Sequence, residues 1–204
     1  MRLILASASP RRRELLAALI TDFDVIPSDL PEEMTGDPTA EAMRLAEAKA
    51  LAVADSAPGA VVIGSDTVVH DGKRFFDKPR DPADAVALLR DLRGRAHTVT
   101  TGVSVVCEGR CVTAASEAGV SLRALTDDEI DAYVASGRPL DKAGAYAIQD
   151  DDIPTVDHLD GCYCCVVGLP LWRLRAALEE CGVTTSEPHL TFGRCAACPE
   201  RPRP

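Results

Sequence analysis

The sequence lacks several features that would point to large or charged partners. Among its 204 residues, no apolar run approaches the roughly 18 residues of a membrane-spanning helix. The net charge of −10 argues against a surface for nucleic acid or anionic membranes. The apolar run at residues 3–6 is far too short for a secretory signal. We therefore expect a cytoplasmic protein without nucleic-acid or membrane partners, whose eight cysteines are reduced, metal-bound or simply buried.

Three widespread catalytic or cofactor-binding patterns are also missing. The sequence contains no Walker A motif, no dinucleotide-binding Gly-x-Gly-x-x-Gly and no zinc-binding His-Glu-x-x-His. None of the histidines has a partner at metal-ligand spacing, so all are expected to be structural or solvated: His70, His97, His158 and His189. The chemistry must therefore come from other side chains.

Hydrophobic segments of strand type and of helix type alternate along the chain. Strands are expected at 3–6, 23–26, 61–69, 98–107 and 111–125, the last two as an antiparallel pair joined at Glu108-Gly109. Helices are expected from Pro10, over 40–54, from Asp81-Pro82 to Gly94, from the capping box at Thr126 to Gly137, and over 169–181. Residues 141–165 are expected as loop and strand.

This order predicts an α/β fold with a mixed sheet flanked by helices. A chain of 204 residues can build one sizeable core, as one domain or as two lobes that share a sheet. We expect the folded domain over residues 1–183. The proline-rich remainder, 184–204, is expected as a tail of little independent structure.

The most informative segment is residues 7–14, Ser-Ala-Ser-Pro-Arg-Arg-Arg-Glu. Ser9 is a good N-cap and Pro10 suits the first helical position, so a helix should begin here. Arginines in the first turn are unfavourable beside the positive end of the helix dipole. A bound anion explains them, held by backbone N–H groups, serine hydroxyls and guanidinium groups. We interpret Arg11 and Arg12 as part of a phosphate site and Arg13 as a solvated charge, the alternative for all three being a solvated basic turn.

Carboxylates that could bind a metal stand in two places. Asp66 ends the apolar run 61–63, and a carboxylate at the end of a strand is a usual metal ligand or general base. The alternative is an aspartate that backbone groups satisfy at a bulge or an edge. Glu32 and Glu33 lie in an acidic loop that could simply be solvated. Together with Asp66 they could hold a hard cation such as Mg²⁺, which takes one or two carboxylates plus phosphate oxygens.

Two lysines and an amide complete the set of candidates. Lys49 falls within the apolar stripe of the helix 40–54, so its ammonium either snorkels to the edge or reaches into a cleft. Lys78 precedes a helix start and could hold a second phosphate. Gln149 ends a segment of small residues, and its amide is suited to reading a polar ring edge.

Taken together, these segments resemble the Maf family of nucleoside triphosphate pyrophosphatases. The resemblance rests on residues 5–12 with Glu14-Leu15-Leu16, on 64–67, on 77–80, on 140–149 and on 166–171. These segments follow the order and spacing of the family from residue 3 to about 180. Because several motifs agree at once, the resemblance is specific.

The resemblance implies a two-lobed mixed sheet with a central cleft, as in inosine triphosphatase-like proteins, and often a homodimer. It implies hydrolysis of a nucleoside triphosphate between the α and β phosphates, giving the monophosphate and pyrophosphate, with Mg²⁺ or another divalent cation. The residues that would hold the triphosphate are Ser7, Arg11, Lys49 and Lys78. Glu32 and Asp66 would bind the metal, with Asp66 as the base for the attacking water.

Three further residues look like marks of the branch that prefers dTTP and UTP over the branch acting on 7-methyl-GTP: Arg12, Thr67 and Gln149. The resemblance thus implies an enzyme that hydrolyses dTTP, UTP or related modified pyrimidine nucleotides. The alternative function is a nucleotide-binding regulator of cell division or septum formation with little turnover. Asp66, Glu32 and Lys78 favour the enzyme, because a pure binder has no use for a carboxylate that activates water.

The sequence departs from the family pattern after Gln149, where Asp150-Asp151-Asp152 stands in place of a glycine. Three acids near a triphosphate site would repel the substrate unless they face solvent or add a metal ligand, and we expect them to face solvent.

The cysteines are a second departure. Cys162 and Cys164 are expected on one face of a strand, and Cys195 and Cys198 form a Cys-x-x-Cys beyond the usual family end. The four thiolates could form a zinc site, structural rather than catalytic, that pins the tail to the body. The alternative is small buried hydrophobic residues in the strand and a disordered tail.

Overall fold

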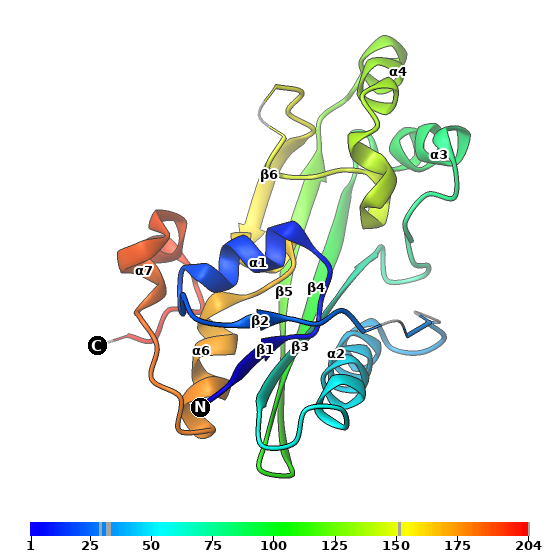
Figure 1. The fold of residues 1–204 in the computed structure, drawn as a ribbon. Coiled ribbons are helices and arrows are strands. Elements are labelled where there is room, and N and C mark those ends of the chain that lie inside the picture. The colour runs from blue at the N-terminus through cyan, green and yellow to red at the C-terminus, as the bar shows by residue number, and fades with distance from the viewer. Residues whose placement is uncertain (29, 32–33, 151, 204) are drawn as a thin grey trace. The chain divides into compact units, whose positions relative to one another are not determined.

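The computed structural model describes residues 1–28, 30–31, 34–150 and 152–203. Its six-stranded sheet has the order β2-β1-β3-β4-β5-β6, with β1 (Leu3–Leu5) parallel to both of its neighbours. The neighbouring strands β4 (Ala96–Cys107) and β5 (Arg110–Leu122) are joined by the two-residue turn at Glu108-Gly109, which makes them an antiparallel pair. The predicted α/β fold with a mixed sheet flanked by helices is therefore confirmed (Figure 1).

The chain divides into two compact units. Unit 1 comprises Met1–Thr67, Thr100–Glu117 and Gly161–Pro204, and unit 2 comprises Val68–Val99 and Ala118–Asp160. The long strands β3 (Val61–His70), β4 and β5 each contribute residues to both units.

Unit 1 contains the N-terminal and C-terminal elements of the chain. Besides β1 it holds α1 (Pro10–Ala17), β2 (Asp24–Val25), α2 (Pro38–Ala54), α5 (Tyr163–Val167), α6 (Leu171–Glu180), α7 (Pro188–Thr191) and the 3₁₀ helix η3 (Gly193–Ala197). Unit 2 holds α3 (Pro82–Leu92), α4 (Asp127–Ala135), the 3₁₀ helices η1 (Arg138–Asp141) and η2 (Ala143–Ala145), and most of β6 (Val156–Gly161).

The helices with clear start signals begin where those signals predict. Ser9 Oγ accepts a hydrogen bond from the backbone N–H of Arg12 at 3.4 Å, and Pro10 opens α1. Thr126 and Glu129 form the predicted capping box of α4. α2 begins two residues before the expected helix 40–54, because the Asp37 carboxylate accepts from the N–H of Ala40 at 2.9 Å and acts as the N-cap.

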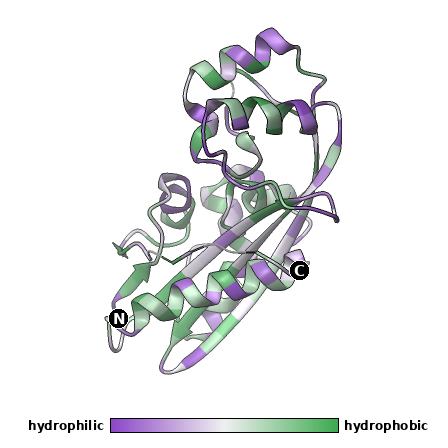
Figure 2. Cartoon of the chain, turned by 90° about the vertical axis from the view of Figure 1, so that its right-hand side faces the viewer, coloured by the Kyte–Doolittle hydropathy of each residue, from purple (hydrophilic) through white to green (hydrophobic). Residues whose placement is uncertain are grey.

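The core of unit 1 depends on the close packing of α2 against the sheet. A Cβ atom on Gly64 of β3 would lie 2.1 Å from the carbonyl oxygen of Ala46, and one on Gly102 of β4 would lie 2.2 Å from that of Ala42. Only glycine leaves room for the helix backbone at these two points. Figure 1 shows α2 and α6 on opposite sides of the strands of unit 1. Figure 2 shows hydrophilic and hydrophobic residues interspersed along the helices, as expected where one face is buried.

Three expectations need correction. Residues 163–167 form α5 rather than a strand, so Cys162 and Cys164 lie at the start of a helix. The C-terminal segment is not without structure, because α7 and η3 form in it and Thr191 Oγ1 donates to the carbonyl oxygen of Ala18 at 2.6 Å. Cys107 and Cys181, whose Cα atoms lie 6.0 Å apart, form a disulfide, which the expectation of reduced, metal-bound or buried cysteines did not include.

Within the described parts of the chain, no helix combines the length and the apolar character needed to cross a bilayer.

Candidate active site

Serines before α1 and arginines in its first turn lie close together. The buried Ser7 Oγ accepts hydrogen bonds from the backbone N–H of Ser9 at 3.3 Å and from Nη1 of Arg12 at 3.4 Å. Arg11 is half-buried, whereas Arg13 is exposed, as the interpretation of a solvated charge requires. The first turn of an eight-residue helix, with backbone N–H groups and a serine hydroxyl, is suited to hold an anion.

Arg12 binds several parts of unit 1 at once. Its Nε donates to the carbonyl oxygen of Gly168 at 2.9 Å, its Nη1 to that of Ser65 at 2.8 Å, and its Nη2 to Oγ1 of Thr67 at 3.0 Å. With the bond to Ser7, protein acceptors occupy at least four of its five N–H groups. The structure thus brings Arg12 and Thr67 together and ties α1 to β3 and to the end of α5.

Lys49 and Asp66 form a buried ion pair. Lys49 lies on the face of α2 that packs on the sheet, and its Nζ is 2.5 Å from Oδ1 of Asp66 on β3. Each of the two side chains is only 6% exposed. Lys49 therefore reaches inward rather than snorkelling to the edge, and Asp66 has a side-chain partner rather than being satisfied by backbone alone. Gly64 permits the approach of the helix that carries Lys49.

Sequence reasoning assigned no role to two residues that hold these side chains in place. The Ser65 hydroxyl is shared between two carbonyl acceptors, that of Gly102 at 2.8 Å and that of Gly168 at 2.9 Å. Gly168 adopts φ 114°, and a Cβ there would lie 3.0 Å from Oγ1 of Thr67 and 3.3 Å from Nε of Arg12. Both residues stood inside the segments that carried the family resemblance, which was the one signal available for them.

Lys78 and Gln149 both lie in unit 2. Lys78 is exposed and Gln149 is half-buried. The segments that carry them lie side by side, because the N–H of Gly144 lies 2.9 Å from the carbonyl oxygen of Phe76 and 3.2 Å from that of Asp77. Within this segment Ala145 has φ 59°, a conformation that costs energy for a residue other than glycine.

Two of the three acids after Gln149 have partners inside unit 2. The Tyr133 hydroxyl donates to Oδ2 of Asp150 at 2.5 Å, and Asp152 pairs with Arg138 at 2.8 Å. Burial and the neighbouring Asp150 raise the pKa of Tyr133, which keeps its phenol protonated as the donor. Asp151 lies outside the described residues.

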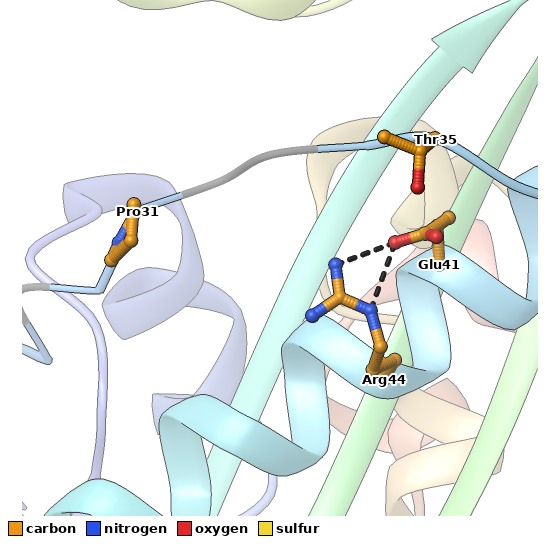
Figure 3. A pocket seen from close by; sticks show the side chains of 4 residues that line it. All are labelled: Pro31, Thr35, Glu41 and Arg44. Atoms are coloured by element: carbon orange, nitrogen blue, oxygen red, sulfur yellow. Dashed lines mark hydrogen bonds and ion pairs between the residues drawn. The ribbon is translucent and has the colours of Figure 1, made fainter.

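A pocket of about 320 Å³ lies beside the start of α2 (Figure 3). Its lining residues are Pro31, Thr35, Glu41 and Arg44. Arg44 Nη2 lies 2.6 Å from Oε2 of Glu41, so the two charges in the pocket neutralise each other. None of the four residues was predicted for the site, and the pocket adds no chemistry to it.

The predicted metal ligands are Asp66 and Glu32, of which Glu32 lies outside the described residues. Of the described residues, only one group of three or more His, Cys, Asp and Glu side chains is close enough to share an ion; it consists of Cys162, Cys198 and Glu200 and does not include Asp66.

The chain is similar to known proteins along most of its length. The family model of Maf-like proteins matches residues 2–181. The dTTP/UTP pyrophosphatase of Gloeobacter violaceus is 49% identical over 184 residues, which cover 88% of this chain and 96% of the relative. That of Geobacter sulfurreducens is 46% identical over 185 residues, 89% and 97% of the two chains. That of Thermomicrobium roseum is 42% identical over 207 residues and covers 99% of this chain and 95% of its own length.

Proposed function

Because the chain belongs to the family of Maf-like proteins, we propose that it is a nucleoside triphosphate pyrophosphatase that hydrolyses dTTP and UTP to the monophosphate and pyrophosphate. The observation that supports this most directly is the buried pair of Lys49 and Asp66 on elements of the same unit as the serines and arginines at the start of α1. Relatives that carry this name match nearly their full length.

In this proposal Asp66 accepts the proton of the attacking water. Lys49 balances the charge of the buried carboxylate and orients it, since a lone carboxylate would be costly at this depth. When the triphosphate binds, the Lys49 ammonium changes its hydrogen-bond acceptor from Oδ1 of Asp66 to a phosphate oxygen. That exchange frees the carboxylate for the proton and stabilises the charge that develops on pyrophosphate.

Ser7, Arg11 and the first N–H groups of α1 are proposed to hold the phosphates. Arg12 has most of its donors on protein acceptors, so we assign it a positioning role toward Thr67 and the turn before α1. The roles of Lys78 toward the phosphates and of Gln149 toward the base stay predictions.

A divalent cation such as Mg²⁺ would be held by Asp66, by Glu32 and by phosphate oxygens, and would supply charge neutralisation and a more acidic water. The homodimer and the cytoplasmic location also stay predictions.

The test is release of pyrophosphate from a panel of nucleoside triphosphates with Mg²⁺, for the wild type and for Asp66→Asn. Loss of the general base is expected to lower kcat by roughly 10²- to 10⁴-fold, with dTTP and UTP the best substrates of the wild type. Asp24→Asn is the matched control, because it changes an exposed carboxylate paired with Arg2 and should leave kcat unchanged.

Asp66→Asn leaves Lys49 buried without its partner, so its folding must be checked by circular dichroism. The double variant Lys49→Met/Asp66→Asn removes both buried charges and supplies a folded, inactive protein if the single variant unfolds. Unchanged kcat in a folded variant would contradict the role of Asp66. Tight nucleotide binding by the wild type without pyrophosphate release would favour the regulator instead.

A further inference from the structure

Four cysteine thiols from two distant parts of the chain meet in unit 1. Cys164 Sγ lies 3.5 Å from Cys195 Sγ, and the Cys162 thiol is within hydrogen-bonding reach of both Cys164 and Cys198. Cys162, Cys164 and Cys195 are each no more than 2% exposed. The two cysteine pairs that the sequence left unconnected are therefore brought together by the fold.

The four sulfurs are neighbours in the order Cys198, Cys162, Cys164, Cys195, and a single tetrahedral ion requires them to draw closer together than they lie in this structure. A zinc–sulfur bond of about 2.3 Å places neighbouring sulfurs of a four-thiolate site roughly 3.8 Å apart. The Cys164–Cys195 separation of 3.5 Å is close to that value, and the sulfurs of Cys162 and Cys198 lie within 4.8 Å of each other. A separation of 3.5 Å is also far longer than a disulfide bond of about 2.05 Å, so this pair is not bonded.

Backbone groups around the cluster are arranged to stabilise thiolates. The N–H groups of Cys165 and Cys164 donate to the sulfur of Cys162, and the N–H of Glu200 donates to the sulfur of Cys198. These donors lie two or three residues after the cysteine, and hydrogen bonds to a charged acceptor are the stronger ones. Arg173, whose Nε is 3.1 Å from Glu200 Oε1, supplies a compensating positive charge beside the cluster.

We propose that Cys162, Cys164, Cys195 and Cys198 bind one structural Zn²⁺ ion. Soft thiolate ligands in a tetrahedral set select zinc over magnesium, so this site is distinct in chemistry from the one at Asp66. Glu200 has a carboxylate oxygen within 4.8 Å of the sulfurs of Cys162 and Cys198; we assign the four ligand positions to the thiolates rather than to Glu200, because soft ligands select zinc.

The ion fastens the segment 184–204, which we propose as an appendage to a catalytic domain over 1–183, to α5. Cys162 and Cys164 stand at the start of α5, while the carbonyl oxygen of Gly168 at its other end accepts from Arg12 at 2.9 Å. A helix of five residues has little stability of its own. The zinc site thus holds the short element to which Arg12 is bound.

The first experiment is elemental analysis of the full-length protein produced with zinc in the medium and purified without chelator. The expected result is one zinc per chain, which falls below a tenth in the double variant Cys195→Ser/Cys198→Ser. Cys111→Ser is the matched control, since Cys111 is an exposed free cysteine outside the cluster, and it should retain full zinc. Glu200→Gln should also retain it.

Two readouts follow the attachment of the segment itself. The single tryptophan, Trp172, donates from Nε1 to the carbonyl oxygen of Cys195 at 3.1 Å, so removal of zinc should shift its fluorescence to longer wavelength. Trypsin should also cut faster after the exposed Arg194 once the segment is released. Arg194 is the site that reports on this segment, because Arg201 and Arg203 are both followed by proline and are not cut.

The proposal is overturned if the wild type neither contains zinc nor takes it up when zinc is added, or if the double variant keeps a full equivalent. It is equally overturned if the bound ion is iron, or if peptide mapping after alkylation finds these cysteines in disulfides. None of these readouts depends on the pyrophosphatase activity, so the two proposals can fail separately.

Discussion

At the scale of single residues, Lys49 and Asp66 illustrate what a charged pair requires at a buried position. Each charge would be costly alone, and their attraction offsets that cost only at short range. Their 2.5 Å contact meets this condition. Such a pair is weak evidence for stability. It is typical of a functional site, because an incoming anion can compete with the carboxylate for the ammonium group.

His97 should make the protein sensitive to acid. Burial lowers the pKa of His97 from 6.5 to about 4, with smaller contributions from the charges of His70 and Arg95. Because the folded protein resists the proton that the unfolded chain accepts, this stability is fully present above about pH 6.5 and is lost as the pH falls towards 4, on the order of 3 kcal/mol.

Urea unfolding of the wild type and of His97→Gln between pH 7.5 and 4.5 measures this. The variant should lose clearly less free energy of unfolding over that interval, because the carboxylates contribute equally to both proteins. Glutamine is chosen because its amide can keep a hydrogen bond to the Tyr146 hydroxyl, which lies 2.6 Å from Nε2 of His97. Parallel pH profiles would contradict the assignment to His97.

At the scale of elements, the contact of α2 with β3 and β4 is the most demanding in unit 1. Gly102→Ala would place a methyl group 2.2 Å from the carbonyl oxygen of Ala42, so the helix must move away. We expect a loss of roughly 3 kcal/mol in the free energy of unfolding, together with lower kcat because Lys49 moves with α2. Denaturant unfolding and pyrophosphate release measure the two effects.

Gly119→Ala provides the comparison, since it makes the same change in β5 where the nearest atom is 3.8 Å away. It should cost less than 1 kcal/mol, as an ordinary strand substitution does. Equal losses in the two variants would mean that strand propensity, rather than helix packing, explains the cost.

Elements with local start signals could be predicted from the sequence, whereas α5 could not. Ser9-Pro10 and the box at Thr126 fix helix starts through bonds within four residues, and both were found as predicted. The start of α5 has no side-chain cap, and its residues favour strands as much as helices. Its conformation comes from partners such as Arg12, which is 156 residues from Gly168 in sequence. Distant contacts of this kind leave no local pattern.

The same limit applies to the candidate site. The apolar stripe around Lys49 placed this lysine on the buried face of its helix but left open whether it snorkels to the edge or reaches inward, and the end of an apolar run marked Asp66. That the two form a pair depends on how α2 packs at Gly64, which the sequence alone did not determine. The family resemblance supplied the roles toward a triphosphate, and the geometry supplies the pairing.

At the scale of the whole molecule, the disulfide between Cys107 and Cys181 joins the end of β4 to the end of α6 across 74 residues of sequence. A link of this span restricts the unfolded chain, so reduction should lower the free energy of unfolding by about 2–4 kcal/mol. Urea unfolding with and without reductant, in excess zinc, measures this. Cys107→Ser/Cys181→Ser should match the reduced wild type and show no response to reductant. If reductant does not change the free energy of unfolding of the wild type, the disulfide adds nothing to stability.

The cysteine cluster has a practical consequence for the boundaries of a shortened chain. The family match ends at residue 181, and a protein cut there would keep Cys162 and Cys164 but lose Cys195 and Cys198. Two thiols that are buried in the full-length protein would then face solvent, open to air oxidation and to pairing between molecules. Aggregation of such a shortened protein on storage would result from the loss of the last twenty-odd residues and should not be attributed to the catalytic domain.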